Sequence, residues 1–185
     1  MNAKKITNIG VLMALSLVMM ILVKFPIIPT MPFLLYEPGD VPILIISFLY
    51  GPLPALVSTL FLSILMAVIT GLGGPYGALM HFLATGAFVG VAGYIYRIKH
   101  TKKGAITGLI SGSLAMTAIM IPANLIVTPI YLGASYQQVI KLLIPGIIPF
   151  NLSKSLINST LTFLVYKKLA NFLREKGLIK SPEAI

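Results

Sequence analysis

The stretch LPALVSTLFLSILMAVIT, residues 53–70, decides the fold class of this chain. It runs for 18 residues without a charged side chain. A helix needs about 20 mainly apolar residues to cross the hydrocarbon core of a bilayer. Inside lipid every backbone N–H and C=O must be bonded within the protein, which excludes an isolated strand. The stretch therefore predicts a membrane-spanning helix.

The composition of the whole chain supports this prediction. Of its 185 residues, 57% are hydrophobic and only 10% are charged, and the mean hydropathy is +0.97. Soluble domains carry about 25% charged residues. These values exclude a soluble enzyme, a disordered chain and a nucleic-acid-binding arm. We therefore expect no nucleic-acid partner, in spite of the net charge of +10.

Other stretches of the chain are also long enough to span a bilayer. They are Ile6–Val23, Ala78–Tyr96, Gly104–Ile121 and Ile147–Tyr166. The first is longer than the apolar region of a signal peptide and lacks a small-residue cleavage site, so we expect it to be retained. A further apolar stretch, Val41–Tyr50, is short. Three prolines at positions 26, 29 and 32 predict a break and a loop over Met31–Asp40, and Pro122, Pro129 and Gly133 predict an irregular region after the fifth span.

The distribution of Lys and Arg predicts the orientation, because cytoplasmic loops are enriched in both. With six spans, eleven of the 14 basic residues lie on the side of the two termini: Lys4, Lys5, Arg97, Lys99, Lys102, Lys103, Lys167, Lys168, Arg174, Lys176 and Lys180. With five spans, the two basic ends would lie on opposite sides. We predict an all-α integral membrane protein with six transmembrane helices and with N- and C-termini cytoplasmic.

In this prediction residues 1–185 form a single transmembrane domain that ends in a polar tail at about 172–185. The short second helix must then be tilted, extended by flanking residues or shielded by protein.

Lys154 is the clearest functional candidate, because an ionisable residue within a span is costly. Asn151, Lys154 and Asn158 are spaced i, i+3 and i+7, which places them on one face of the last helix. This stripe of an ammonium and two amides can hydrogen-bond a polar, planar ligand. The alternative is that these groups only join helices or reach toward the interface.

Other unusual polar residues lie near the same, outer end of the predicted helices. They are Glu37, Asp40, His81 and Asn124. Their convergence suggests a binding pocket that opens to the outside. Each also has a plainer interpretation: Glu37 and Asp40 as a turn and helix cap, and His81 as a hydrogen-bonded packing residue.

The sequence offers no catalytic site and no metal-ligand cluster. It has two His and four acidic residues without metal-site spacing, no nucleophile elbow and no Walker A motif. We therefore expect no enzyme, no metal and no cofactor. All four acids fall in predicted loops or in the tail, so we expect no buried carboxylate of the kind that proton-driven carriers use, and energy for transport would come from other subunits.

Gly10 and Ala14 form a small-xxx-small pair on the first helix. Such a pair lets another helix approach closely. The pair alone leaves open whether that helix belongs to a partner or to the same chain.

Three motifs carry a resemblance to a known family. They are PFLLYEPGDVP at residues 32–42, GPYGALMHFLA at residues 74–84 and NLSKSLIN at residues 151–158. They resemble the riboflavin-specific S components of energy-coupling factor transporters, which are membrane-embedded vitamin receptors of prokaryotes. The resemblance covers the whole chain. The first helix departs from the Ala-xxx-Ala often seen in S components, because this chain has Gly10 and Ala14.

The resemblance implies a plasma-membrane protein that binds riboflavin from outside with high affinity. It would act with a transmembrane coupling subunit and two cytoplasmic ATPase subunits. The resemblance implies that Asn124, Asn151 and Lys154 contact the isoalloxazine edge, with Asn158 on the same stripe. Leu35 would cap the ring, and Asp40, Ala78 and His81 would lie toward the ribityl chain. Gly10 and Ala14 would contact the coupling subunit. The flavin would be cargo. Three alternatives stay open: an S component for flavin mononucleotide (FMN) or another vitamin, a stand-alone ion-coupled carrier, and a membrane protein without transport activity.

Overall fold

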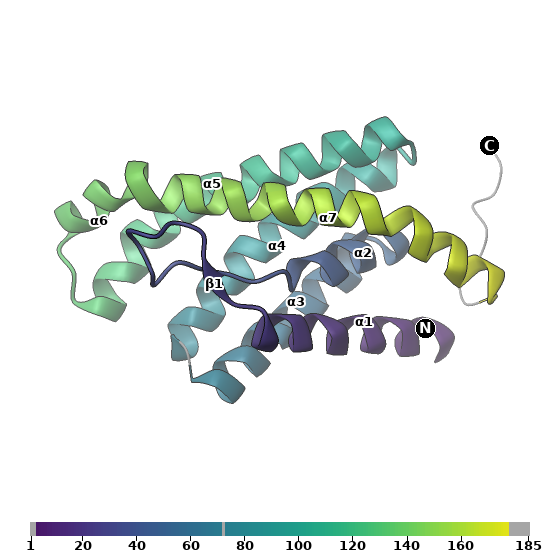
Figure 1. Ribbon diagram of the computed structural model, residues 1–185, viewed down its shortest axis with the longest axis horizontal. Helices are drawn as coiled ribbons and strands as arrows, with labels where there is room; N and C mark the ends of the chain where they lie inside the picture. Colours follow the sequence, from purple (N-terminus) through teal and green to yellow (C-terminus); the bar gives the residue numbers. More distant parts are fainter. Residues whose placement is uncertain (1–2, 72, 178–185) are drawn as a thin grey trace.

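The computed structural model describes residues 3–71 and 73–177 as a helical bundle (Figure 1). Its helices are α1 (Ala3–Leu22), α2 (Asp40–Tyr50), α3 (Pro52–Thr70), α4 (Gly74–Ile98), α5 (Lys102–Leu132), α6 (Tyr136–Leu142) and α7 (Ile148–Glu175). A π-helical turn, Leu143–Ile147, precedes α7. Two short strands, β1 (Phe25–Pro26) and β2 (Leu35–Tyr36), form an antiparallel ribbon between α1 and α2.

The two ends of the described chain lie at the same end of the bundle, and α6 lies at the opposite end (Figure 1). Five of the helices are long and apolar enough to span a membrane. A further apolar helix, α2, has only 11 residues. The position of both chain ends at one end of the bundle agrees with the six-helix arrangement that the charge distribution predicted.

The short helix α2 is shielded by protein, which decides among the three options left open by the sequence. Every residue from Asp40 to Phe48 is buried. The helix contacts α1, α3, α4 and α7. Because its neighbours surround it, α2 need not match the thickness of the bilayer by itself.

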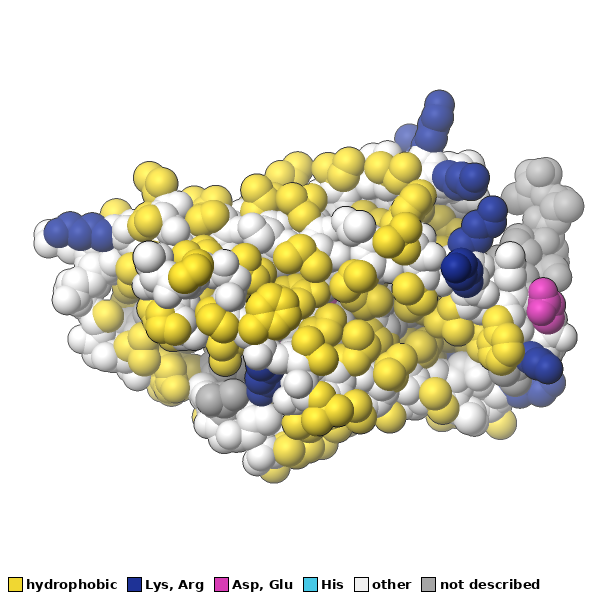
Figure 2. Space-filling view, viewed as in Figure 1, with side chains coloured by type: hydrophobic (Ala, Val, Ile, Leu, Met, Phe, Trp, Pro, Cys, Tyr) yellow, Lys and Arg dark blue, Asp and Glu magenta, His cyan; other side chains and the backbone are white. Residues whose placement is uncertain are grey.

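The outer surface has the pattern of a chain dissolved in lipid. Large apolar side chains such as Leu22 (75% exposed) and Val68 (76% exposed) point outward from the long helices. In Figure 2 hydrophobic side chains cover the visible flank, and most Lys and Arg side chains gather at the end that holds the termini. This segregation agrees with the enrichment of basic residues on the cytoplasmic side of membrane proteins.

The prediction of an irregular region after the fifth span is wrong. The helix α5 continues through Pro122 and Pro129 and ends at Leu132, before Gly133 with φ 64°. Proline removes one backbone hydrogen bond, but neighbouring helices and local adjustments make it tolerable within a membrane helix. The last helix is also longer than expected and reaches Glu175, while residues 178–185 of the expected polar tail lie outside the described residues.

The helices α4 and α5 pack closely because glycine lies at their crossing. A β-carbon at Gly108 would lie 2.7 Å from the backbone oxygen of Ala92. A β-carbon at Gly112 would lie 2.7 Å from the backbone oxygen of Phe88. Both neighbours are backbone atoms of a helix, so they cannot move aside alone.

We expect Gly108→Ala to destabilise the protein. Alanine normally favours a helix by about 0.5–1 kcal/mol over glycine, but overpacking at this crossing costs about 1–3 kcal/mol. The melting temperature in detergent, followed by circular dichroism, should fall by roughly 5 °C. Gly90→Ala is the matched control, because its β-carbon would lie 3.7 Å from the Leu56 side chain, an ordinary contact. A variant Gly108→Ala as stable as Gly90→Ala would contradict this packing.

Candidate functional site

The segment between α1 and α2 folds back into the bundle. The ribbon pairs Phe25 with Tyr36, and their rings lie 5.1 Å apart. Ser16 on α1 donates a hydrogen bond of 2.6 Å to the backbone oxygen of Gly39. The Met20 side chain occupies the space that a β-carbon at Gly39 would need. The predicted loop is therefore anchored on α1, and it carries Glu37 and Asp40 inward.

Lys154 forms a buried ion pair with this loop. Its Nζ donates a hydrogen bond of 2.5 Å to Oε1 of Glu37 and lies 3.8 Å from Oδ2 of Asp40. The exposed fractions are 6% for Lys154, 9% for Glu37 and 1% for Asp40. A buried charge is tolerated when it is paired and hydrogen-bonded. The two carboxylates thus allow an ammonium to lie inside the bundle.

Side chains of other helices complete the bonding of Asp40. Thr85 on α4 donates a hydrogen bond of 2.7 Å to Oδ1, and the Asn158 amide on α7 donates one of 3.0 Å to Oδ2. The Tyr36 hydroxyl donates one of 2.9 Å to Oδ1 of Asn158. Burial, followed by the charge of Asp40, raises the pKa of the loop residue Tyr36 to about 12. The hydroxyl therefore stays protonated and remains a donor.

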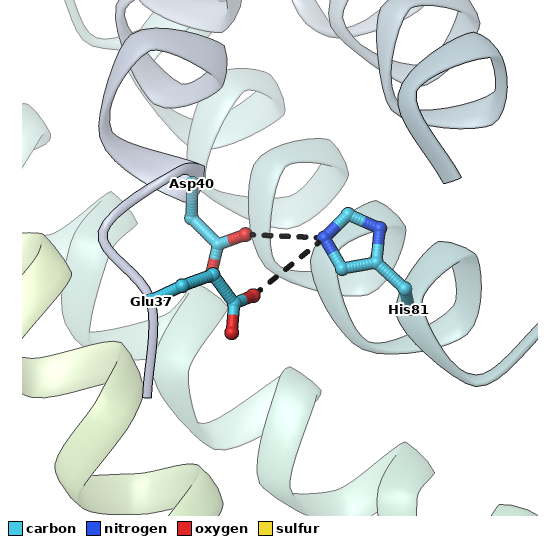
Figure 3. A group of neighbouring side chains, drawn as sticks. All are labelled: Glu37, Asp40 and His81. Atoms are coloured by element: carbon cyan, nitrogen blue, oxygen red, sulfur yellow. Dashed lines mark ion pairs between the residues drawn. The ribbon is translucent and has the colours of Figure 1, made fainter. Parts of the chain in front are cut away.

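His81 faces the same two carboxylates (Figure 3). Its Nε2 lies 3.8 Å from Oδ1 of Asp40 and 4.0 Å from Oε1 of Glu37, and its Nδ1 lies 2.7 Å from the Ser63 hydroxyl. The sequence predicted no metal-ligand cluster, yet the structure brings three possible ligands within 4.8 Å of one another. A cation there would have to displace the Lys154 ammonium from both carboxylates, so we assign no metal.

Two expectations about the acidic residues are wrong. Asp40 is the first residue of α2, but its side chain makes no cap and bonds to α4 and α7 instead. The sequence also predicted no buried carboxylate, yet Glu37 and Asp40 are both buried, because the loop folds inward and Lys154 pairs with both. Their sequence position in a proline-rich loop gave no sign of this burial.

A cavity of ≈ 610 Å³ lies beside this cluster. Such a volume is typical of a small-molecule site. Its lining is rich in methionine: Met20, Met66, Met80, Met116 and Met120. Polar groups of Glu37, His81, Asn151 and Lys154 also line it. The cavity therefore combines an adaptable apolar wall, suited to a flat ring, with a few groups that can fix its polar edge.

The structure brings most of the predicted site residues together. Those that line the cavity are Leu35, Ala78, His81, Asn151 and Lys154. Asp40 and Asn158 lie behind the wall, where they bond to each other. The side chain of Asn124 instead bonds within α5, to the backbone oxygen of Met120 at 2.8 Å. Since Asn124 lies one turn beyond the cavity-lining Met120, its role in ligand binding stays a prediction.

The family described as ECF transporter, substrate-specific component matches residues 4–166, which is most of the chain.

The chain belongs to this family.

Several riboflavin transporters are similar to this S component. RibU of Staphylococcus aureus is 33% identical, with 92% of this chain and 93% of the relative covered. RibU of Streptococcus thermophilus is 30% identical, with 93% and 85% covered. FmnP of Bacillus subtilis is 26% identical, with 95% and 97% covered. A solved structure of the S component of a bacterial ECF transporter superposes with a TM-score of 0.79 at 33% identity, over 92% of this chain and 97% of the other.

Several residues of the S-component site were missed by sequence reasoning. Glu37 was grouped with the polar residues at the outer end, but its pairing with Lys154 was not predicted, and Tyr36, Ser63 and Thr85 were not singled out. Thr85 lies four residues after His81 and so on the same helical face, a spacing that could have revealed it. The contacts of Tyr36 and Glu37 span more than a hundred residues of sequence, and no local pattern reports them.

The small residues of α1 are exposed on the S component. Gly10 and Ala14 both face outward, and no atom of the neighbouring helices lies within 4 Å of a β-carbon built on Gly10. Of the two alternatives left open by the sequence, close packing of this pair against another described helix of the same chain is therefore excluded. The face remains available for a helix from another protein.

We expect the Lys154–Glu37 pair to be energetically coupled. Lys154→Met should lower the free energy of unfolding by about 3 kcal/mol, because it leaves two buried carboxylates without their cation. Glu37→Gln in the same chain should recover part of this loss. The measurement is thermal unfolding in detergent for the two single variants and the double variant.

Lys141→Met is the control, since Lys141 is an exposed lysine of α6 and should change stability little. Strictly additive losses in the double variant would show that the two side chains do not stabilise each other.

Proposed function

We propose that this S component binds riboflavin from outside and delivers it across the plasma membrane together with an ATP-hydrolysing energy-coupling module. The cavity beside Lys154 is the observation that carries this proposal, because it combines a methionine-rich lining with a few polar groups. The family match and the relatives named riboflavin transporters support it. The S component is a multi-pass membrane protein, and its cargo is the vitamin.

The polar end of the cavity suits the edge of an isoalloxazine ring. That edge alternates hydrogen-bond acceptors with a donor. An ammonium has three donors and an amide has both a donor and acceptors. Lys154 uses one donor on Glu37 at 2.5 Å. It therefore keeps others for a ring oxygen, with the amide of Asn151 beside it and Asn124 as a further candidate.

The first loop is the natural cover of the bound ring. Leu35 on β2 and Glu37 both line the cavity. Because Glu37 bonds Lys154, a ligand that reaches Lys154 also meets this loop. His81 and the backbone at Ala78 then lie on the α4 side, where we place the ribityl chain.

The energy-coupling partners would dock from the side and from the cytoplasm. Gly10 and Ala14 on α1 offer a close-approach face for a helix of the transmembrane coupling subunit. The basic end of the bundle, which holds both termini, faces the cytoplasm in this proposal, and the two ATPase subunits lie on that side. The S component itself then has the role of a receptor and not of an enzyme.

One observation favours a second candidate, a stand-alone ion-coupled carrier. The buried carboxylates of Glu37 and Asp40 beside His81 are groups that such carriers use. Each carboxylate already has Lys154 as a counter-ion, which argues for a structural role. Uptake by vesicles that contain this chain without any ATPase would favour the carrier.

We expect purified protein to quench riboflavin fluorescence, and Lys154→Met to weaken this binding at least tenfold. The loss follows from removing a charge-assisted hydrogen bond, about 1.5–3 kcal/mol. Asn151→Ala should weaken binding less, and it keeps the ion pair intact as a check on folding. Lys141→Met is the matched lysine control.

Asn124→Ala in the same titration decides the role of that amide. A loss like that of Asn151→Ala would place it at the ring. Unchanged affinity of Lys154→Met, with the protein folded, would exclude Lys154 from the site and with it this assignment of the polar edge.

We expect Gly10→Leu and Ala14→Leu to reduce riboflavin uptake strongly while leaving riboflavin binding unchanged. The larger side chains would hold a partner helix away from α1. Uptake is measured in cells that supply the coupling subunit and ATPases, and binding in detergent. Ala118→Leu is the control, because Ala118 is an exposed alanine on α5. Equal uptake by all three variants would place the coupling interface elsewhere.

A further inference from the structure

The buried cluster around Lys154 has two carboxylates but one ammonium. The carboxylates belong to Glu37 and Asp40, and Lys154 pairs with both. Lys24 also lines the cavity, but it forms no ion pair with the residues that the structure describes. A buried charge without a counter-ion is costly. Among the described residues, His81 is the one other basic side chain that lies within 4.0 Å of both carboxylates.

The hydrogen bonds of Ser63 place a proton on Nδ1 of His81. The Ser63 hydroxyl donates a hydrogen bond of 2.7 Å to the backbone oxygen of Thr59. The same hydroxyl oxygen lies 2.7 Å from Nδ1 of His81. A hydroxyl has one proton to donate, and a backbone oxygen can only accept. Because the Ser63 proton is used on Thr59, the ring must be the donor to Ser63.

Three oxygen acceptors face the other ring nitrogen, Nε2. Thr85 donates its one hydroxyl proton to Oδ1 of Asp40 at 2.7 Å, and its oxygen lies 3.4 Å from Nε2. Oδ1 of Asp40 and Oε1 of Glu37 lie 3.8 Å and 4.0 Å from the same nitrogen (Figure 3). An ionised carboxylate is an acceptor only. A ring with its proton on Nδ1 alone would therefore turn a lone pair toward three oxygens, whereas a proton on Nε2 is attracted to all three.

We propose that His81 is a proton-binding site in the cavity wall. At neutral pH it holds a proton on each ring nitrogen, and this imidazolium is the second cation of the cluster. Burial disfavours a charged ring, but two nearby carboxylates and acceptors at both nitrogens favour it. The set of Glu37, Asp40, Lys154 and His81 then carries no net charge, which suits groups enclosed within a membrane protein. His81 lines the cavity, so the proton exchanges with solvent from that side.

The proton on His81 connects pH with the position of the first loop. The charged groups that surround the ring come from three elements: Glu37 from the first loop, Asp40 from α2 and Lys154 from α7. Ser63 of α3 and Thr85 of α4 bond the ring without charge. Loss of the Nε2 proton would leave two carboxylates with one ammonium and a lone pair turned toward them. The first loop would then be bonded less tightly, so the stability of the folded protein should fall as pH rises.

The first test observes the ring directly. The chain has two histidines, so His100→Gln leaves His81 as its single imidazole. His100 is exposed and does not line the cavity, which makes this a mild change. In detergent, NMR of this variant labelled with ¹⁵N at histidine should show protons on both nitrogens of His81 at neutral pH. As pH rises, Nε2 should lose its proton first and Nδ1 should keep it. A neutral ring at neutral pH would overturn the proposal.

Thermal unfolding in detergent tests the same charge without labelling. A histidine in an unfolded chain loses its proton near about pH 6.5. A ring that keeps its proton in the folded protein therefore makes stability fall above that pH. The melting temperature of His100→Gln should drop by roughly 3 °C or more between about pH 6 and about pH 8.5. Adding His81→Gln should make this drop smaller, because an amide does not titrate. Equal pH dependence of the single and the double variant would overturn the proposal.

Riboflavin binding is the third measurement, and this part of the inference rests on the proposed function. Leu35 and Glu37 of the first loop line the cavity, so a loop that is bonded less tightly should bind riboflavin less well. The affinity of His100→Gln should fall over the pH range in which NMR shows the loss of the Nε2 proton. The fall is at most about tenfold per pH unit, because one proton is involved.

Constant riboflavin affinity over that pH range would overturn the link between the proton and the first loop. Failure to bind riboflavin at any pH, by protein in which NMR shows a doubly protonated His81, would instead overturn the proposed function and support the proton site.

Discussion

The ion pair of Lys154 with Glu37 and Asp40 is the interaction on which the bundle depends. An ammonium within a membrane helix requires a counter-ion, and the carboxylates require a cation. Satisfying both forces the first loop to fold inward against α7, with Thr85 of α4 bonding the same carboxylate cluster. The short helix α2 then begins at Asp40, in the middle of the protein. One electrostatic requirement thus determines where the loop, α2 and α7 meet.

The same groups define the ligand cavity, so structure and recognition are not separate in this protein. Lys154 and Glu37 line the cavity and also hold the bundle together. Their geometry is fixed before a ligand arrives, which reduces the ordering that binding requires. The methionines of the lining are adaptable, because thioether side chains are flexible and polarisable. Rigid polar contacts and a compliant apolar wall together favour a flat ring with one polar edge.

Much of the fold follows from the sequence, and the reasons for the failures are physical. Apolar length predicted the long helices, and the positions of Lys and Arg predicted that the two ends meet. Pro122 and Pro129 were misleading. Proline usually ends a helix in a soluble protein, but a membrane helix tolerates it, because neighbouring groups bond the freed backbone atoms. Lys154 and Asn151 were found because polar residues stand out in an apolar run. The pairing of Glu37 with Lys154 could not be found in this way, because the two residues lie 117 positions apart in the sequence.

That separation has a consequence for how the protein is made. Glu37 and Asp40 leave the ribosome early, whereas Lys154 and Asn158 belong to the last helix, 117 and 118 residues later. At about 5–20 residues per second, translation needs roughly 6–24 s to cover this interval. During this time the two acids have neither cation nor amide, so the first loop must wait in water or at the lipid headgroups. The cluster of Glu37, Asp40, Lys154 and Asn158 forms only when α7 inserts. Insertion of this last helix is therefore the step that completes co-translational assembly.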